Sequence, residues 1–219
     1  MAAVSIPEQQ SPHIAGEAFV RRYRDEDAKA VADICVRTAD AGQDATGIYA
    51  DPAILDHLFA APYAALDPQL AFVLDDGSGR AVGYVLGTDD THRFADRFRD
   101  EWLPRVAGRH AAAPDAAPVG PDELMAWLLH HPDRLKVPGL EGYPGHLHID
   151  LLPGHQRQGH GSRLLDRLVR ELAGRGTPAL HVGMLTTNTS ARAFYDRLGF
   201  HRIPIEDPAL TYLGLEVGP

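Results

Sequence analysis

The sequence predicts an α/β protein in which one sheet is flanked by helices. Two observations support this class. Segments with the two-residue period of strands alternate with segments of helical period, and the second half holds a strand, a glycine turn and an amphipathic helix in direct succession. The chain has 219 residues, of which 44% are hydrophobic, so we expect one large domain with a normal core.

The first 88 residues predict one strand, two helices and a hairpin. Residues 1–17 are polar and contain two prolines, so we expect a flexible tail before a domain spanning 18–219. A strand at 18–23 precedes a helix whose buried face includes Cys35. A second helix begins at Asp51-Pro52. Two further strands are joined by a turn rich in Asp and Gly, which predicts a β-hairpin; they span 70–74 and 81–86.

Residues 89–145 interrupt this pattern and predict a helical insertion between the third and fourth strands. Apolar residues at helical spacing indicate one helix around Phe94–Leu103 and another around Leu124–Leu129, separated by a low-complexity segment at 111–121. A connection of this length is usually functional or independently structured. We expect a cap over a substrate site; a dimer contact is the alternative.

The remaining chain alternates strands and helices. Residues 146–152 predict a half-buried strand, and 156–162 form a glycine-containing turn before a strongly amphipathic helix over 163–172. Further along we expect a strand at 179–185, a helix at 188–198 and final strands at 200–203 and 210–217.

Composition excludes several classes of protein. The formal net charge is −9, which disfavours a general nucleic-acid binder and gives a weak preference for cationic substrates. A single cysteine excludes an internal disulfide. There is neither an apolar run long enough to span a bilayer nor a signal-like N-terminus, so we expect a cytoplasmic protein without membrane contact.

The glycine turn is a candidate phosphate site. Gly159 and Gly161 allow peptide N–H groups to approach an anion, and the next helix adds the positive end of its dipole. The turn lacks the third glycine of the dinucleotide fingerprint, because Leu164 stands there, and it lacks the Gly-Lys-Ser/Thr of a P-loop.

Together with a later motif, this turn resembles the GNAT superfamily of acetyl-CoA-dependent acetyltransferases. The matching pieces are Gln156-Arg157-Gln158-Gly159-His160-Gly161 and the Asn-x-x-Ala-x-x-Phe-Tyr-x-x-x-Gly-Phe run over 188–200. Residues 38–46, 61–63 and 146–150 also look like a bacterial branch similar to the acetyltransferase-like C-terminal domain of animal O-GlcNAcase. That second resemblance supports CoA binding more firmly than turnover.

The resemblance implies a mixed, mostly antiparallel sheet, splayed where acetyl-CoA enters. Peptide groups of Leu151 and Leu152 would pair with the pantetheine arm, and Asn188 would bond the same arm. Tyr195 would protonate the departing thiolate, because a phenol is a weaker acid than a thiol. The turn residues that would hold the pyrophosphate are Gln156, Arg157, Gln158, Gly159, His160, Gly161 and Ser162.

A general base is expected on the strand beside the cofactor. His146, His148 and Asp150 alternate and therefore project from one face, and we predict that Asp150 or His148 accepts the amine proton. The same three residues could also be considered as ligands of a metal ion. Same-face neighbours on a strand lie ~7 Å apart, too far for all three to share one ion, so we predict no metal.

The acceptor side is less determined by the sequence. Asp40 and Asp44 would either bind a cationic amine or only form turns, and Tyr63 and Trp102 would wall a pocket or fill the core. We predict transfer of an acetyl group by direct attack of an amine, carried on a small molecule or a peptide, in a protein that could form a homodimer. The alternative is a CoA-binding module without turnover.

Overall fold

A computed structural model describes residues 16–112 and 117–218 of this chain. The predicted tail at 1–17 therefore lies almost wholly outside the described residues. Among those described, no helix combines the length and the apolar character that crossing a bilayer requires.

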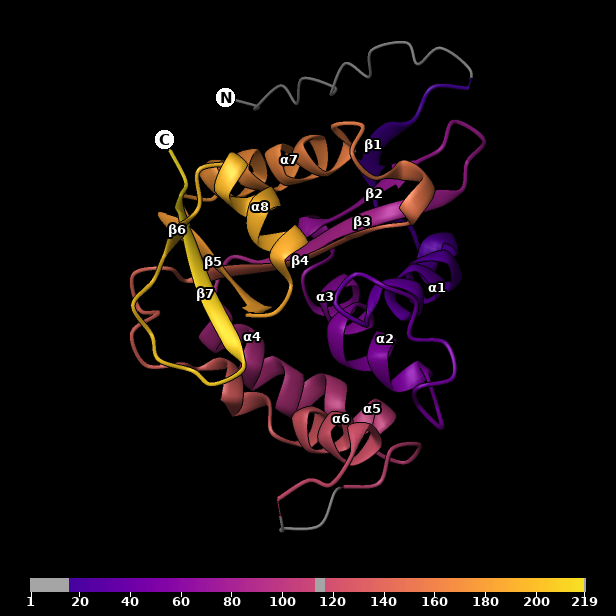
Figure 1. Ribbon diagram of the computed structural model, residues 1–219, viewed down its shortest axis with the longest axis vertical. Helices are drawn as coiled ribbons and strands as arrows, with labels where there is room; N and C mark the ends of the chain where they lie inside the picture. Colours follow the sequence, from indigo (N-terminus) through magenta and orange to yellow (C-terminus); the bar gives the residue numbers. More distant parts are fainter. Residues whose placement is uncertain (1–15, 113–116, 219) are drawn as a thin grey trace, which may run out of the picture.

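Seven strands form one sheet in the order β1-β2-β3-β4-β5-β7-β6 (Figure 1). Every neighbouring pair is antiparallel except β4 and β5, which run parallel. This confirms the predicted α/β class with a mixed, mostly antiparallel sheet. The strands are β1 (Phe19–Arg22), β2 (Ala71–Asp75), β3 (Ala81–Thr88), β4 (Gly145–Leu151), β5 (Ala179–Leu185), β6 (His201–Arg202) and β7 (Leu210–Glu216).

Helices cover both faces of the sheet. In Figure 1, α7 and α8 lie on one side of the strands and α1 to α3 on the other, while the helices of the insertion extend beyond α2. The helices are α1 (Ala28–Thr38), α2 (Ala53–Phe59), α3 (Ala61–Leu66), α4 (Thr91–Arg97), α5 (Leu103–Val106), α6 (Pro121–His130), α7 (His160–Gly174) and α8 (Thr189–Arg197).

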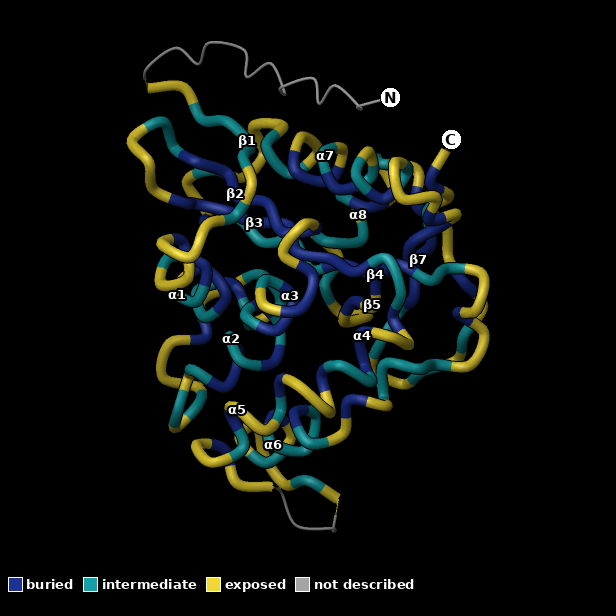
Figure 2. The backbone as a smooth tube through the Cα atoms, turned by 180° about the vertical axis from the view of Figure 1, so that it is seen from behind, coloured by how far each residue is buried: buried dark blue, intermediate teal, exposed yellow. Residues whose placement is uncertain are grey.

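The insertion contributes to the main core. Figure 2 shows β2 and β3 buried along their whole length at the centre of the molecule. Phe94, Trp102 and Leu129 of the insertion belong to the same cluster of buried side chains as these strands. The predicted helix around Phe94–Leu103 is divided into α4, a π-helical stretch (Phe98–Trp102) and α5. The insertion is thus helical, as predicted, but it is packed as core.

The sheet splays between β4 and β5. These strands pair only at Gly145↔Leu180 and His146↔His181, whereas β3 stays paired with β4 as far as Leu151. The far end of β4 therefore faces an opening in the sheet, which confirms the predicted splay.

Glycine is required at two positions at the start of α7, for a different physical reason at each. Gly159 adopts φ 80°, a left-handed conformation that other residues rarely take. Gly161 is required by packing, because a Cβ there would lie 2.9 Å from the Phe194 ring of α8. The turn thus sets both the direction of α7 and its close approach to α8.

We therefore expect Gly161→Ala to lower the free energy of unfolding by about 1–3 kcal/mol, because the Phe194 ring must shift to admit the methyl group. Denaturant titration measures the change. Gly174→Ala is the matched control in the same helix: a Cβ there meets no atom, and stability should stay constant or rise. Equal effects of the two substitutions would contradict the packing argument.

Candidate active site

Three polar residues of β4 project from one face of the sheet, as their alternation predicts. The register places Tyr84 of β3 opposite Asp150, and the Tyr84 hydroxyl donates a hydrogen bond of 2.7 Å to that carboxylate. Burial raises the pKa of Asp150 to about 6, although hydrogen bonds from Tyr84 and Thr38 oppose the increase. The Asp150 side chain therefore gains or loses its proton at a pH close to neutrality.

The other two members of the row belong to a hydrogen-bonded chain. His146 Nδ1 lies 2.9 Å from Thr91 Oγ1, and its Nε2 lies 2.6 Å from the Tyr63 hydroxyl. The same hydroxyl lies 3.2 Å from His148 Nε2. Tyr63, which lies in α3, thus bridges the imidazoles of His146 and His148.

Each hydroxyl has one proton to donate, so the donors and acceptors along this series of hydrogen bonds can be assigned. Thr91 donates to the carbonyl oxygen of Pro144 at 2.7 Å, so it must accept from His146 Nδ1–H. His146 Nε2 then accepts from Tyr63, whose oxygen accepts from His148 Nε2–H. The lone pair of His148 is consequently on Nδ1.

Both histidines are neutral at pH 7. Burial, and secondarily the charge of Arg134, lowers the pKa of His148 to about 4. Burial also holds the pKa of His146 well below its ordinary value, with further contributions from His181 and His148. Since both ring nitrogens of His146 are already bonded, we assign it a positioning role.

Tyr195 reaches the same region from α8. Its ring is buried against Phe194 and Phe200, and its hydroxyl forms no hydrogen bond to any residue that the structure describes. Burial raises the pKa of Tyr195, and the charge of Asp150 raises it further. The phenol is therefore protonated at neutral pH and lies within the electrostatic reach of Asp150.

The open edge of β4 offers peptide groups to a ligand. Leu152 N–H donates to the carbonyl of Val82 at 3.0 Å, so alternate residues of β4 direct their peptide groups toward β3. Ile149 and Leu151, in the intervening positions, direct theirs toward the opening. Of the two residues predicted to pair with an extended ligand, Leu152 has both peptide groups engaged, since its carbonyl accepts from His155 at 2.9 Å. The Leu151 carbonyl accepts from the Gln156 side chain at 2.8 Å, so the Leu151 N–H and the peptide groups of Ile149 are the ones offered to the opening.

The turn before α7 is largely exposed, with Gln156, Arg157, Gln158 and Gly159 on the surface. Gln156 donates to the Leu151 carbonyl at 2.8 Å, and Gln158 donates to Gly154 at 2.8 Å. No side chain caps α7, so the N–H groups of His160, Gly161 and Ser162 have no acceptor within the helix. Such a helix start can bind an anion.

Asn188 has a structural partner in addition to its predicted ligand role. It is the N-cap of α8, and its Oδ1 accepts a hydrogen bond of 2.9 Å from Ala191 N–H. Its side-chain NH₂ forms no hydrogen bond within the described part of the chain, so it is available to a ligand.

The predicted acceptor residues lie in two different environments. Asp40 and Asp44 are exposed, and Asp44 accepts from Thr46 N–H at 2.8 Å, as a turn-forming residue does. Trp102 is buried and donates to the His57 carbonyl at 2.8 Å. Of the four residues, only Tyr63 bonds to the β4 row.

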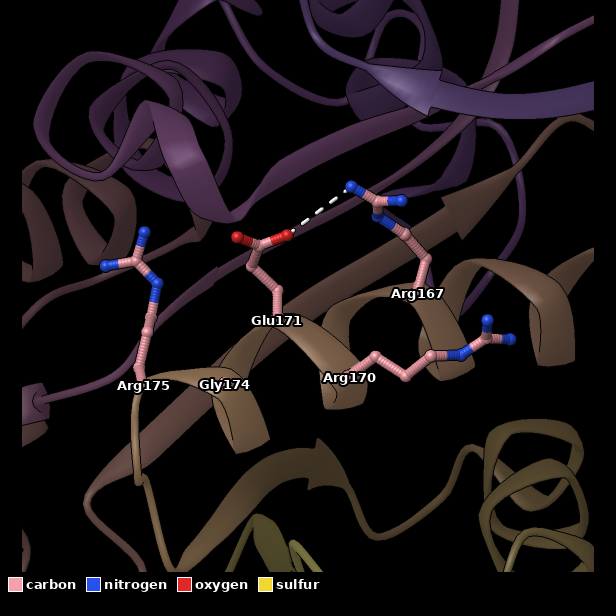
Figure 3. Close-up of a pocket in the computed structure, with 5 residues that line it drawn as sticks. All are labelled: Arg167, Arg170, Glu171, Gly174 and Arg175. Carbon is pink, nitrogen blue, oxygen red and sulfur yellow. Dashed lines mark hydrogen bonds and ion pairs between the residues drawn. The ribbon is translucent and has the colours of Figure 1, made fainter. Parts of the chain in front are cut away.

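A shallow hollow on α7 is separate from the splay (Figure 3). It is lined by Arg167, Arg170, Glu171, Gly174 and Arg175. Every arginine there has a carboxylate partner: Arg167 pairs with Glu171, Arg170 with Asp166 and Arg175 with Asp89. None of the predicted site residues lines this hollow.

The comparisons with known proteins agree with this architecture. The model of the acetyltransferase (GNAT) family matches residues 41–200, so the chain belongs to the GNAT family. Acetyltransferases of this family use acetyl-CoA. Residues of all three groups described above, the β4 row, the α7 turn and the α8 tyrosine, lie inside the matched range.

One solved structure is similar over nearly the whole chain. The crystal structure of SsHAT is 53% identical, covers 93% of this chain and 100% of its own, and superposes with a TM-score of 0.89. The acetyl-CoA complex of the putative acetyltransferase yncA from Salmonella typhimurium is 15% identical, covers 92% of this chain and 94% of its own, and has a TM-score of 0.52, which shows the fold alone.

Among curated proteins, the [ribosomal protein bS18]-alanine N-acetyltransferases are similar in part. That of Escherichia coli K12 is 42% identical over 53 residues, which is 24% of this chain and 36% of the relative. That of Haemophilus ducreyi is 38% identical over 53 residues, with 24% and 37% covered. The match thus spans about a third of the relatives' length.

Two residues of the site had no signal in the sequence. Tyr84 lies in an ordinary apolar strand, and its pairing with Asp150 depends on a register set across the whole insertion. Arg134 lies in a 3-10 turn (Pro132–Leu135) of the insertion and looks like a surface arginine in the sequence.

Tyr84→Phe should raise the pKa of Asp150 above its present value near 6, because the lost hydrogen bond stabilises the ionised carboxylate. Bonds to charged groups are worth about 1.5–3 kcal/mol, so we expect an increase of about one pH unit or more. Carboxyl NMR titration measures it. Tyr49→Phe is the control, since Tyr49 has no bond to Asp150. An unchanged or lower pKa in Tyr84→Phe would contradict the assignment.

Proposed function

We propose that this protein is an N-acetyltransferase that transfers the acetyl group of acetyl-CoA to an amine by direct attack. One observation carries the proposal: beside the splay of β4 and β5, a carboxylate with a pKa near 6 acts electrostatically on a protonated phenol that bonds to no described residue. Family membership supports the acetyl donor.

The residues present fit acetyl-CoA. The free N–H groups at the start of α7 suit its pyrophosphate, and the peptide groups of Ile149 and Leu151 suit the amides of its pantetheine arm, like an added strand. The Asn188 NH₂ group would bond the same arm. Acetyl-CoA supplies the activated acyl group, and the protein supplies binding, orientation and proton transfer.

Asp150 is the stronger candidate for the general base. A base works best when its pKa lies near the working pH. The pKa of Asp150 is about 6, whereas that of His148 is about 4, so Asp150 removes a proton from the amine more readily. His148, whose Nδ1 carries the lone pair, would then help to orient the acceptor.

Tyr195 is suited to protonate the leaving thiolate. Its raised pKa keeps the phenol protonated at neutral pH, so a proton is available to the sulfur as the thioester bond breaks. A covalent relay through the cysteine is disfavoured, because Cys35 is buried and burial raises the pKa of its thiol.

The proposed base predicts a pH profile. Asp150 must be ionised to accept a proton, so kcat at saturating substrates should rise with pH through about 6 and then level off. Asp150→Asn should lower kcat by roughly 10²–10⁴-fold and abolish this rise. His148→Asn should leave the rise in place. A rise centred near 4 that disappears in His148→Asn would instead make His148 the base.

Tyr195→Phe should lower kcat with little change in acetyl-CoA affinity, because the hydroxyl acts on the departing thiolate. Calorimetry with acetyl-CoA, together with a thiol-release assay over a panel of amines, measures both quantities. Tyr49→Phe is the control. An unchanged kcat would remove Tyr195 from the acid role. If acetyl-CoA binds and no amine releases thiol above the background in water, the proposed turnover is wrong.

A further inference from the structure

Arg134 is a half-buried cation that has no anionic partner among the described residues. It lies in the 3-10 turn Pro132–Leu135 between α6 and β4, and its Nε donates to the Leu128 carbonyl at 3.1 Å. Among the described residues, no carboxylate forms an ion pair with it. The bond to Leu128 fixes the side chain, and neither terminal nitrogen donates to an acceptor in the described part of the chain.

The surroundings of this guanidinium are polar and neutral. Burial lowers the pKa of Arg134, and its charge acts on Tyr63 of α3 and Tyr212 of β7. The same charge lowers the pKa of His148, which is neutral at pH 7. Arg134 thus lies where the insertion, α3, β4 and β7 meet, next to the proposed active site.

Arg21 and Arg97, two other half-buried arginines, are paired with carboxylates. Arg21 contacts Asp27 at 2.6 Å and Asp75 at 2.8 Å. Arg97 contacts Glu101 at 2.9 Å and Asp67 at 3.3 Å. Removing a guanidinium from water is costly unless an anion or several acceptors compensate for the lost hydration. The protein supplies such an anion elsewhere and leaves it out at Arg134.

We propose that Arg134 binds the carboxylate of the acceptor, so that the acceptor is an amine that also carries a carboxylate. This deepens the proposed function and rests on it. A guanidinium fork with two free nitrogens matches a carboxylate in a bidentate manner. The hydroxyl of Tyr212, which forms no hydrogen bond to a described residue, can donate to the same anion.

The position of Arg134 also indicates the length of the acceptor. Its charge acts on Tyr63, whose hydroxyl lies 2.6 Å from His146 Nε2 and 3.2 Å from His148 Nε2, so Arg134 lies on the histidine side of the β4 row rather than at Asp150. Same-face neighbours on a strand are ~7 Å apart. An amine at Asp150 and a carboxylate at Arg134 are therefore separated by several bonds, as in an ω-amino acid or a side-chain carboxylate of a peptide, rather than in an α-amino acid.

The test compares acceptors that differ only in charge. The probes are 4-aminobutyrate and 6-aminohexanoate, each beside its amide, and a short peptide with a free N-terminus and a Glu or Gln side chain. We expect the wild-type protein to prefer the acid of at least one pair by 10-fold or more in kcat/KM. Arg134→Met should lower kcat/KM for that acid by about 100-fold and should change kcat/KM for its amide by no more than about 3-fold. The peptide pair distinguishes a peptide carboxylate from a free ω-amino acid.

Arg105→Met is the matched control, because Arg105 is an exposed arginine of the same insertion and forms no ion pair with any residue that the structure describes. It should retain the preference for the acid. Arg134→Lys, which keeps the charge but not the fork, should be intermediate and serves if Arg134→Met fails to fold. Acid and amide acetylated equally by the wild type, or a preference that survives in both Arg134 variants, would overturn the inference.

A binding measurement separates this inference from the proposed function. Calorimetry of the same acids and amides on the CoA-loaded protein needs no turnover. Acid-selective binding that is lost in Arg134→Met, without acetyl transfer to any probe, would sustain the carboxylate site and refute the acetyltransferase proposal. Acetyl transfer without selectivity for the acids would support the acetyltransferase proposal and refute the carboxylate site. If neither acetyl transfer nor acid-selective binding is seen, the carboxylate site is overturned.

Discussion

The early parting of β4 from β5 is the constraint on which the rest of the site depends. The two strands share only two residue pairs, yet neither is left unsupported. β4 keeps six pairs with β3 from His146 to Leu151, and β5 keeps seven pairs with β7. Each half of the sheet therefore has a complete ladder on its far side, and the opening costs only the hydrogen bonds of the parted edges. A ligand with amide groups can replace those bonds.

Desolvation governs the charges around this opening. Burial is the first cause of the raised pKa of Asp150 and Tyr195 and of the lowered pKa of His146 and His148. One physical effect thus produces a carboxylate poised near neutrality, a protonated phenol and two neutral imidazoles. The protein achieves these states without placing a counter-charge beside each group, which leaves the cleft free of fixed salt bridges that a substrate would have to break.

Local pattern was enough to predict much of the site. The period of two in residues 146–150 put the two histidines and Asp150 on one face, and the glycines before α7 marked the turn that we propose binds an anion. Features that depend on long-range packing were not visible. The partnership of Tyr84 with Asp150 needs a register fixed across 57 residues, and the bridge made by Tyr63 needs the position of α3. The insertion was expected to be a cap because a connection of this length is usually functional or independently structured. Phe94, Trp102 and Leu129 show that it contributes to the core.

The net charge of −9 gave a weak preference for cationic acceptors, and the structure shows why a whole-chain sum is a poor guide to one site. Many of the acids lie on the surface, where they pair with arginines or form turns, as Asp51 does with Arg109 and Asp44 with Thr46. Beside the opening, the side chains include a cation, Arg134, for which the described residues supply no carboxylate. Net charge acts on the approach of a ligand over a Debye length of roughly 8–10 Å, whereas recognition is decided by the groups left unpaired where water is excluded. An acidic protein can for that reason select an anionic group on its substrate.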